Sequence, residues 1–184
     1  MTTHILLMRG VNVGGHNRLP MADLRALLTN LGYTDVATYL QSGNAVCNAE
    51  GSPAEVEAQV AAGFEAELSL SVPVLARTAG QWAALVAANP LVHLDDDPKH
   101  LHVTFLDGPP LADRLSGLAD EASVLAPERI EVVGADAYLH TPGGFGVTRF
   151  TPSFLERRLG RVATTRNWRT VLALADLAGA ASLR

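Results

Sequence analysis

The stretch Ile5-Leu6-Leu7-Met8-Arg9-Gly10-Val11-Asn12-Val13-Gly14-Gly15-His16-Asn17-Arg18 starts with four apolar residues and then changes abruptly to glycines, asparagines and arginines. A continuous apolar run of this kind is typical of a strand that is buried on both faces. Glycine tolerates positive φ and lets backbone N–H groups come close to a ligand, while Arg9 and Arg18 can offer forked donors to a phosphate or carboxylate. We therefore expect a buried strand that opens into a ligand-facing loop.

The residues that follow predict a first half that ends at residue 90. Apolar residues recur every three or four positions after Leu19-Pro20, which predicts a helix that Gly32 ends. Ser42-Gly43-Asn44 lies between two short apolar stretches and indicates a hairpin. The expected elements are a strand at 3–8, a helix at 19–32, strands at 36–40 and 45–48, a helix at 53–68, a strand at 72–77 and a closing helix at 79–88.

The same order of elements starts again at residue 101, after a predicted linker at 91–100. The expected elements are a strand at 101–106, a helix at 111–122, strands at 129–133 and 137–140, a helix at 151–159, a strand at 161–163 and a final helix at 168–178. Two βαββαβ series predict an α+β fold of two tandem ferredoxin-like halves, residues 1–90 and 101–184, and the second half also carries the C-terminal helix.

Four motifs occur in order along the chain: Arg9-Gly10-Val11-Asn12-Val13-Gly14-Gly15, Met21-Ala22-Asp23-Leu24-Arg25, Tyr39-Leu40-Gln41-Ser42-Gly43-Asn44 and Ala163-Thr164-Thr165-Arg166-Asn167-Trp168. Together they resemble the bacterial domain of unknown function 1697 family, nearly from end to end of the chain. The resemblance implies two ferredoxin-like halves in tandem, and it implies no activity. That family commonly has two basic residues around a serine where this chain has Val147, Thr148 and Arg149, so the role of that basic pair is open here.

Composition favours the cytoplasm. No N-terminal segment combines a basic flank, an apolar core and a small-residue cleavage site, and no segment approaches the about 20 apolar residues that a membrane span needs. The single cysteine, Cys47, cannot form an internal disulfide, and it is most simply a small buried hydrophobic residue. We expect a cytoplasmic protein without a membrane partner.

The charge of the chain is unevenly distributed. A formal net charge of −5 disfavours a protein that coats nucleic acid by bulk attraction, and an aromatic content of 5% disfavours RNA binding through exposed sheet aromatics. Between Gly146 and Arg184, seven arginines occur with only Glu156 and Asp176, so this segment carries +5 and the rest of the chain −10. The segment is either an arginine-rich solvated surface or the electropositive wall of a cleft.

The glycine-rich loop and the start of the last helix are the two candidate anion sites. The loop is neither a Walker A loop nor a dinucleotide fingerprint, so it is either a tight connection or a ligand contact. Arg166 is expected at the N-terminus of the last helix, where a cation is unfavourable unless an anion or a carboxylate compensates it. We place Arg9 and Arg166 at one cleft between the halves, and the candidate ligand-binding residues are Arg9, Gly10, Asn12, Gly14, Gly15, Asn17, Ser42, Asn44, Arg149, Thr165, Arg166 and Asn167.

Other chemistry-bearing residues favour structural roles. His93, His100 and His102 occur near Asp95-Asp96-Asp97, but the pattern fits an acidic solvated loop better than a metal site. Ser42 reads as a turn hydroxyl, and no catalytic residue, cofactor or oligomeric state is indicated. Two functions stay open: binding of a phosphorylated or anionic small ligand, nucleotide-like in character, or a protein-interaction module without catalytic activity that uses a sheet edge or the last helix.

Overall fold

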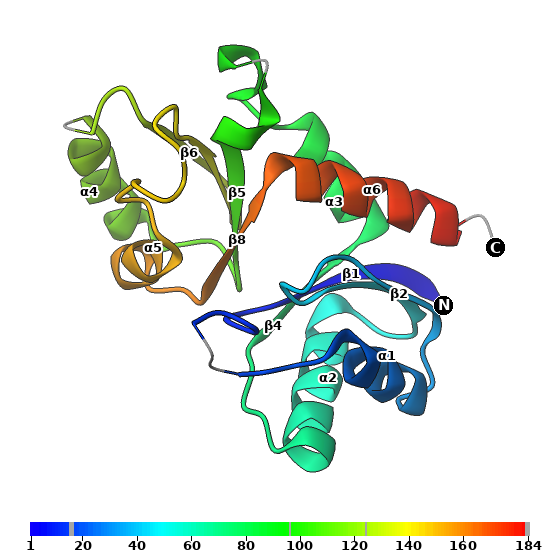
Figure 1. Ribbon diagram of the computed structural model, residues 1–184. Helices are drawn as coiled ribbons and strands as arrows, with labels where there is room; N and C mark the ends of the chain where they lie inside the picture. Colours follow the sequence, from blue (N-terminus) through cyan, green and yellow to red (C-terminus); the bar gives the residue numbers. More distant parts are fainter. Residues whose placement is uncertain (15–16, 96, 124, 183–184) are drawn as a thin grey trace. The chain divides into compact units, whose positions relative to one another are not determined.

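The computed structural model describes residues 1–14, 17–95, 97–123 and 125–182. Within these ranges the fold is α+β, with six α-helices and two four-stranded antiparallel sheets (Figure 1). The elements are β1 (Thr2–Met8), α1 (Met21–Asn30), β2 (Thr34–Thr38), β3 (Asn44–Ala49), α2 (Pro53–Leu68), β4 (Val74–Thr78), α3 (Ala79–Ala87), η1 (Val92–Leu94), η2 (Pro98–His100), β5 (Leu101–Leu106), α4 (Ala112–Ser123), β6 (Arg129–Val133), β7 (Asp136–His140), α5 (Pro152–Leu159), β8 (Ala163–Asn167) and α6 (Trp168–Ser182). None of the described helices is long and apolar enough to cross a membrane.

The first sheet has the strand order β2-β3-β1-β4, and every neighbouring pair is antiparallel. Helices α1 and α2 cover one face of this sheet (Figure 1), where apolar side chains of both helices and of the strands form one core cluster. The two helices pack closely because Gly63 of α2 has no side chain: a Cβ there would lie 3.2 Å from Leu27 of α1. Ser52 and Glu55 start α2 with a reciprocal capping box.

The second sheet has the order β6-β7-β5-β8, again with antiparallel neighbours. Helices α4 and α5 lie on one face of this sheet (Figure 1), and Leu118, Leu155 and Leu159 belong to a core cluster with residues of the strands. The α5 helix begins as the sequence predicts, because the Thr151 hydroxyl accepts a hydrogen bond from the Phe154 backbone and Pro152 occupies the first turn.

Two strand positions differ from the sequence-based prediction. The last strand of the second sheet was expected at 161–163 but spans Ala163–Asn167, where it pairs with β5 from Leu106 to His102. The first hairpin strand was expected at 36–40 but ends at Thr38, because Leu40 has a φ of +57° and leaves the strand conformation. The length of β8 thus depends on pairing with β5, whereas the end of β2 is set by a local backbone conformation.

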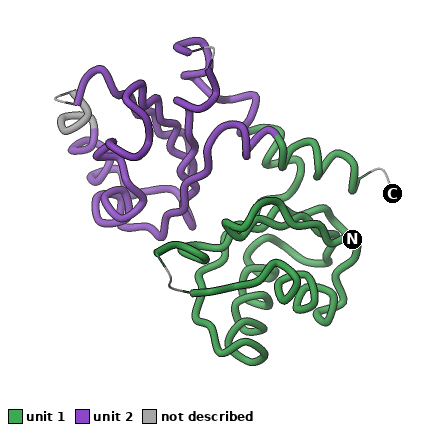
Figure 2. The backbone as a smooth tube through the Cα atoms, viewed as in Figure 1, with its two compact units in different colours: residues 1–84, 173–184 green, residues 85–172 purple. Residues whose placement is uncertain are grey.

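The chain groups into two compact units (Figure 2). Unit 1 contains residues 1–84 and 173–184, and unit 2 contains residues 85–172. This grouping assigns most of α6 to unit 1, whereas the predicted second half includes all of that helix. One bond within unit 1 illustrates the assignment: the hydroxyl of Ser182, near the end of α6, lies 3.0 Å from that of Thr3 on β1. The linker predicted at 91–100 contains η1 and η2 and falls within unit 2.

Candidate functional site

The loop after β1 has an alternating backbone conformation. Gly10, Asn12 and Gly14 have φ values of +69°, +55° and +59°, while Val11 and Val13 between them do not have positive φ. A Cβ at Gly10 or Gly14 would meet no atom within 4 Å, so packing does not require glycine at either position. The left-handed conformation does, because L side chains adopt it rarely.

Asn12 holds this loop in place and connects it to the turn between β2 and β3. Its side-chain N–H groups donate to the carbonyl oxygens of Leu19, at 2.8 Å, and Gln41, at 2.6 Å. Its side-chain oxygen accepts from the Leu19 backbone N–H at 2.9 Å. Asn17 supports the same loop, since its side chain donates to the Gly10 carbonyl at 3.4 Å and its own carbonyl accepts from the Asn12 N–H. Both asparagines therefore satisfy loop backbone groups.

The turn between β2 and β3 is packed against this loop. Gly43 has a φ of +73°, and a Cβ there would collide with Val11 Cγ2 and lie 2.8 Å from Met8 Cβ. Asn44 is fully buried, and its side chain donates to the Tyr39 carbonyl at 2.8 Å and to the Ser42 hydroxyl at 3.0 Å. Within unit 1 the structure thus brings together five predicted residues: Gly10, Asn12, Asn17, Ser42 and Asn44.

We call the exposed side of these two segments the loop surface, defined by Gly10, Val13, Gly14, Arg18 and Leu40. Val13 and Leu40 are 64% and 56% exposed, so they offer apolar area on this side of the loop. Arg18 is exposed, whereas Arg9 is half-buried and makes contacts of its own. Gly15 and His16 lie outside the described residues, so the predicted role of Gly15 stays a prediction.

Arg166 precedes the last helix, as the sequence predicted, but it is part of a strand. It lies inside β8, opposite Val103 of β5, and α6 begins two residues later. Its side chain donates to the Thr164 hydroxyl at 2.7 Å and to the Thr165 carbonyl at 2.9 Å. The residue is 8% exposed, and burial lowers the pKa of its guanidinium to about 10. The strand β8 extends further than predicted and includes Arg166, and the role of Arg166 in ligand binding stays a prediction.

The neighbours of Arg166 point to the opposite face of β8 and have structural partners. The hydroxyls of Thr165 and Thr104 lie 2.7 Å apart. The Asn167 side-chain oxygen caps α6 by accepting from the Arg169 backbone N–H at 3.0 Å. Its amide donates to carbonyl oxygens of the segment before β5, including Lys99 at 3.1 Å.

The predicted residues of unit 2 include one exposed cation. Arg149 is exposed, as is Val147, at the position where the family commonly has a basic residue. Thr148 between them is buried and donates to Glu128 at 2.8 Å. Unit 2 therefore holds Arg149, Thr165, Arg166 and Asn167, and the predicted convergence of Arg166 with Arg9 of unit 1 stays a prediction.

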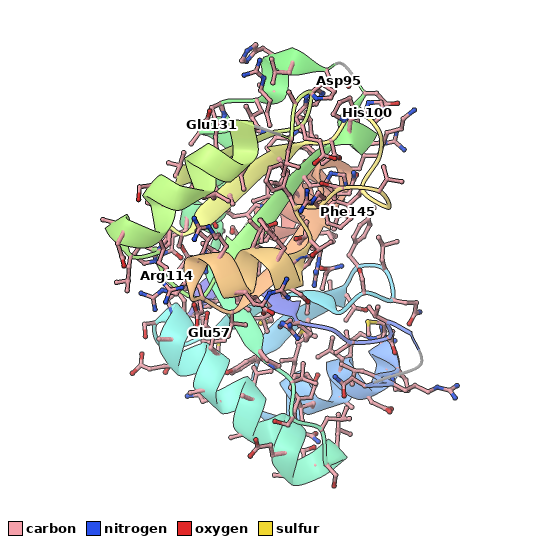
Figure 3. All side chains as sticks on the ribbon, turned by 90° about the vertical axis from the view of Figure 1, so that its left-hand side faces the viewer. Glu57, Asp95, His100, Arg114, Glu131 and Phe145 are labelled. Atoms are coloured by element: carbon pink, nitrogen blue, oxygen red, sulfur yellow. The ribbon has the colours of Figure 1, made fainter. Side chains whose placement is uncertain are left out.

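His102, named in the sequence analysis near an acidic loop, has a buried position in unit 2. His102 is 6% exposed, stacks on Phe145 at a centroid distance of 4.4 Å, and has Nε2 3.2 Å from the Asn167 amide. Burial lowers the pKa of His102 to about 4. Figure 3 labels Phe145, the stacking partner of His102. His102 and Thr104 alternate with apolar residues in β5, a pattern that predicts one exposed face, so the sequence contains no signal for the burial of His102.

Asp95 binds two histidines at one carboxylate oxygen. Its Oδ2 lies 2.7 Å from His100 Nδ1 and 3.3 Å from His140 Nε2. The Asp97 backbone N–H and the His100 ring hold the pKa of Asp95 below its usual value. Across the described part of the chain, no group of three histidine, cysteine or acidic side chains has the geometry to hold a metal ion.

Unit 2 also has an open pocket of about 360 Å³ beside strand β6. It is lined by Pro90, Leu91, His93, Leu94, Arg129 and Glu131. Sequence reasoning did not predict this pocket, because it forms between a loop and an edge strand that lie 35 residues or more apart in the chain.

These features define an α+β protein of two four-stranded antiparallel sheets, with a glycine-rich loop after the first strand. The chain belongs to the family described as protein of unknown function DUF1697, which matches residues 1–138. Among solved structures, the chain is similar to the conserved bacterial protein SP0830 from Streptococcus pneumoniae, with 22% sequence identity and a TM-score of 0.75 over 96% of this chain and 98% of that one. This similarity supports the fold alone. No curated protein matches the chain.

Proposed function

We propose that the loop surface of unit 1 binds a phosphorylated or otherwise anionic small ligand. The observation that carries the proposal is the alternation of φ at Gly10, Asn12 and Gly14. Positive φ at exposed glycines lets their backbone N–H groups approach an anion, and concave groups of such donors bind anions. The Asn12 N–H is not one of these donors, because it bonds to the Asn17 carbonyl. Exposed glycines without close neighbours keep that backbone accessible to a ligand.

The hydrogen bonds of Asn12 support the proposal by fixing the shape of the loop. All three of its polar positions are used within the protein, so we assign Asn12 a positioning role and not a ligand contact. A loop that is already held in its binding conformation loses little entropy when the ligand binds. Arg18, exposed at the end of the same loop, supplies a forked cation.

The chemical class of the ligand follows from the mixed character of the surface. Backbone amides and Arg18 suit a phosphate, and the exposed Val13 and Leu40 offer apolar area beside them. A nucleotide combines an anionic group with a flat, largely apolar base, so it fits this surface better than an inorganic ion does. We propose no reaction.

The test is calorimetric titration of the intact protein with adenosine monophosphate, inorganic phosphate and adenosine. We expect the monophosphate to bind most tightly, and Gly14→Ala to weaken it about tenfold or more by distorting the loop. Gly134→Ala is the matched control, because Gly134 also has an exposed positive-φ backbone, at +60°, with no atom within 4 Å of a Cβ, but lies in the β6–β7 turn. Equal, undetectable binding of all three probes would rule out the nucleotide site.

A protein-interaction surface is the second candidate, and one specific observation favours it. Leu40 is large, 56% exposed and held at a φ of +57°, a conformation that is costly for a bulky residue. Strained backbone of this kind is found at binding sites, where it fixes the orientation of a side chain that contacts a partner. Leu40→Asn keeps the backbone conformation and removes the apolar anchor. If it abolishes capture of a protein partner while phosphate-bearing probes never bind, the second function replaces the first.

We further infer that both units are ferredoxin-like and arose by duplication. The strand orders correspond, with β1 to β4 matching β5 to β8. Two loop hydrogen bonds also recur: Met8 N–H to the Gly43 carbonyl matches Leu106 N–H to the Ala135 carbonyl, both at 2.9 Å. Arg9 N–H to the Pro73 carbonyl likewise matches Asp107 N–H to the Val162 carbonyl. An experimental structure in which these paired bonds are absent would contradict the inference.

A further inference from the structure

Strand β6 is the open edge of the second sheet. Its only strand neighbour is β7, and none of the described residues forms a hydrogen bond to its outer side. An unpaired strand edge presents a row of backbone donors and acceptors that another strand can use. Charged residues often protect such an edge, and β6 carries two of them, Arg129 and Glu131.

The register of the hairpin identifies which backbone groups are free. Val133 and Asp136 close a two-residue turn of Gly134 and Ala135, so this pair exchanges both backbone hydrogen bonds. Hydrogen-bonded pairs alternate along the ladder, and the backbone of Glu131 and Arg129 therefore bonds toward β7. The N–H and C=O groups of Ile130 and Val132 point to the open side.

The side chains of β6 are self-complementary. Arg129 and Glu131 are both exposed on one face, two positions apart, and neither forms an ion pair with any described residue. We propose that β6 pairs with β6 of a second copy of this chain, antiparallel and centred on Ile130. In this register Arg129 of each copy lies opposite Glu131 of the other, so the two-fold axis produces two cross-strand ion pairs.

The charges select this register over its alternatives. Pairing centred on Glu131 would oppose the two carboxylates, which is destabilising. Pairing centred on Val132 satisfies the same backbone groups but brings no opposite charges together. The register centred on Ile130 also places the ion pairs at non-hydrogen-bonded positions, where opposite side chains are closest, at about 4.5 Å between Cα atoms.

The pocket beside β6 provides room for the second copy. Arg129 and Glu131 line it together with His93 and Leu94, so the long side chains of the other copy would extend into a space that is open in the single chain. Exposed Val92 and Leu94, at 51% and 37%, offer apolar surface for the stems of those side chains. A contact between two short strands is small, so we expect a weak, concentration-dependent dimer.

Sedimentation equilibrium of the intact protein over a wide concentration range tests the proposal. We expect reversible dimerisation that Glu131→Arg weakens about tenfold or more. In that variant Arg129 of each copy lies opposite the new arginine at position 131 of the other copy, and the like charges repel. Arg129→Glu should have the same effect. The double variant R129E/E131R restores opposite charges in both pairs and should recover the dimer. Glu65→Arg, a reversal of an exposed charge on α2, is the control for net charge and should leave dimerisation unchanged.

Three results would overturn the proposal. The first is a protein that stays monomeric at every concentration. The second is a dimer that Glu131→Arg leaves unchanged, since association then uses another surface. The third is a double variant that dimerises as weakly as the single variants do. Circular dichroism of each variant confirms that the sheet is intact, which is expected because the substituted side chains are exposed.

Discussion

The side-chain amide of Asn12 donates to the Gln41 carbonyl at 2.6 Å and so joins the loop after β1 to the turn between β2 and β3. These two segments are nearly 30 residues apart in the chain. The same side chain exchanges two hydrogen bonds with the Leu19 backbone. Asn12 therefore makes three of the hydrogen bonds that hold the loop surface, in a left-handed conformation that asparagine tolerates better than most residues.

Asn12→Asp should lower the free energy of unfolding by about 1–3 kcal/mol. The substitution keeps an oxygen for the Leu19 N–H and tolerates positive φ, but it places a carboxylate against two carbonyl oxygens. Denaturant unfolding of the variant measures the change. Asn17→Asp, which affects one longer bond of 3.4 Å, should cost less. Equal stability of Asn12→Asp and the parent protein would mean that these bonds do not hold the loop.

Gly43→Ala should destabilise the protein by about 2 kcal/mol or more, because the new methyl group collides with Val11 and Met8 and the backbone has positive φ. Gly32→Ala is the matched control, since Gly32 also has positive φ, at +84°, but no atom lies within 4 Å of a Cβ. That control should lose only about 1 kcal/mol. Thermal and denaturant unfolding separate the two effects. Val11→Ala in the Gly43→Ala background should recover part of the loss, and its failure to do so would contradict the steric explanation.

Acidification should destabilise the protein through His102. Burial lowers its pKa to about 4 from an ordinary value of 6.5, so between these pH values the unfolded chain binds the proton more readily than the folded protein does. The free energy of unfolding is therefore not reduced by His102 above pH 6.5, and it decreases as the pH falls from 6.5 toward 4. Burial also lowers the pKa of His4, which adds to the same slope.

Denaturant midpoints measured between pH 4 and 7 check this dependence. His102→Gln cannot be protonated and should flatten the slope, at the cost of the stacking on Phe145. His93→Gln is the control, because His93 is exposed. A slope that His102→Gln leaves unchanged would assign the acid sensitivity to other groups.

The sequence predicted the element order well because each element carries a local signal. The four apolar residues Ile5 to Met8 became part of the buried strand β1, and Ser42-Gly43-Asn44 lies where the β2–β3 hairpin connection meets β3. The α+β class and the antiparallel hairpins were confirmed in this way. The glycines of the first loop were also informative, since positive φ is a local backbone property.

The sequence could not predict features that depend on tertiary pairing. The full length of β8 follows from its register with β5, and that register includes Arg166 in the strand, where the sequence predicted only a connection to α6. The cluster of Asp95, His100 and His140 joins residues from a loop, η2 and β7. No spacing in the chain encodes such a contact, so His140 was missed.

Variants of Arg166 can distinguish a structural role of this arginine from a ligand-binding role. It is 8% exposed, donates to Thr164 and Thr165, and has further contacts. A buried guanidinium persists only when its donors are paired, and its removal leaves those partners unsatisfied. We therefore expect Arg166→Ala to lower the free energy of unfolding by about 3 kcal/mol, whereas the helix-end prediction required stability to stay level or rise.

Arg166→Lys should recover little of that loss, because an ammonium group cannot reproduce the fork that reaches a hydroxyl and a carbonyl at once. Arg149→Ala is the control, since Arg149 is exposed and the substitution should change stability by less than about 0.5 kcal/mol. Denaturant unfolding of the three variants, with nucleotide titration in parallel, decides the matter. If Arg166→Ala is as stable as the parent protein and loses nucleotide affinity, Arg166 contacts the ligand and the structural role is contradicted.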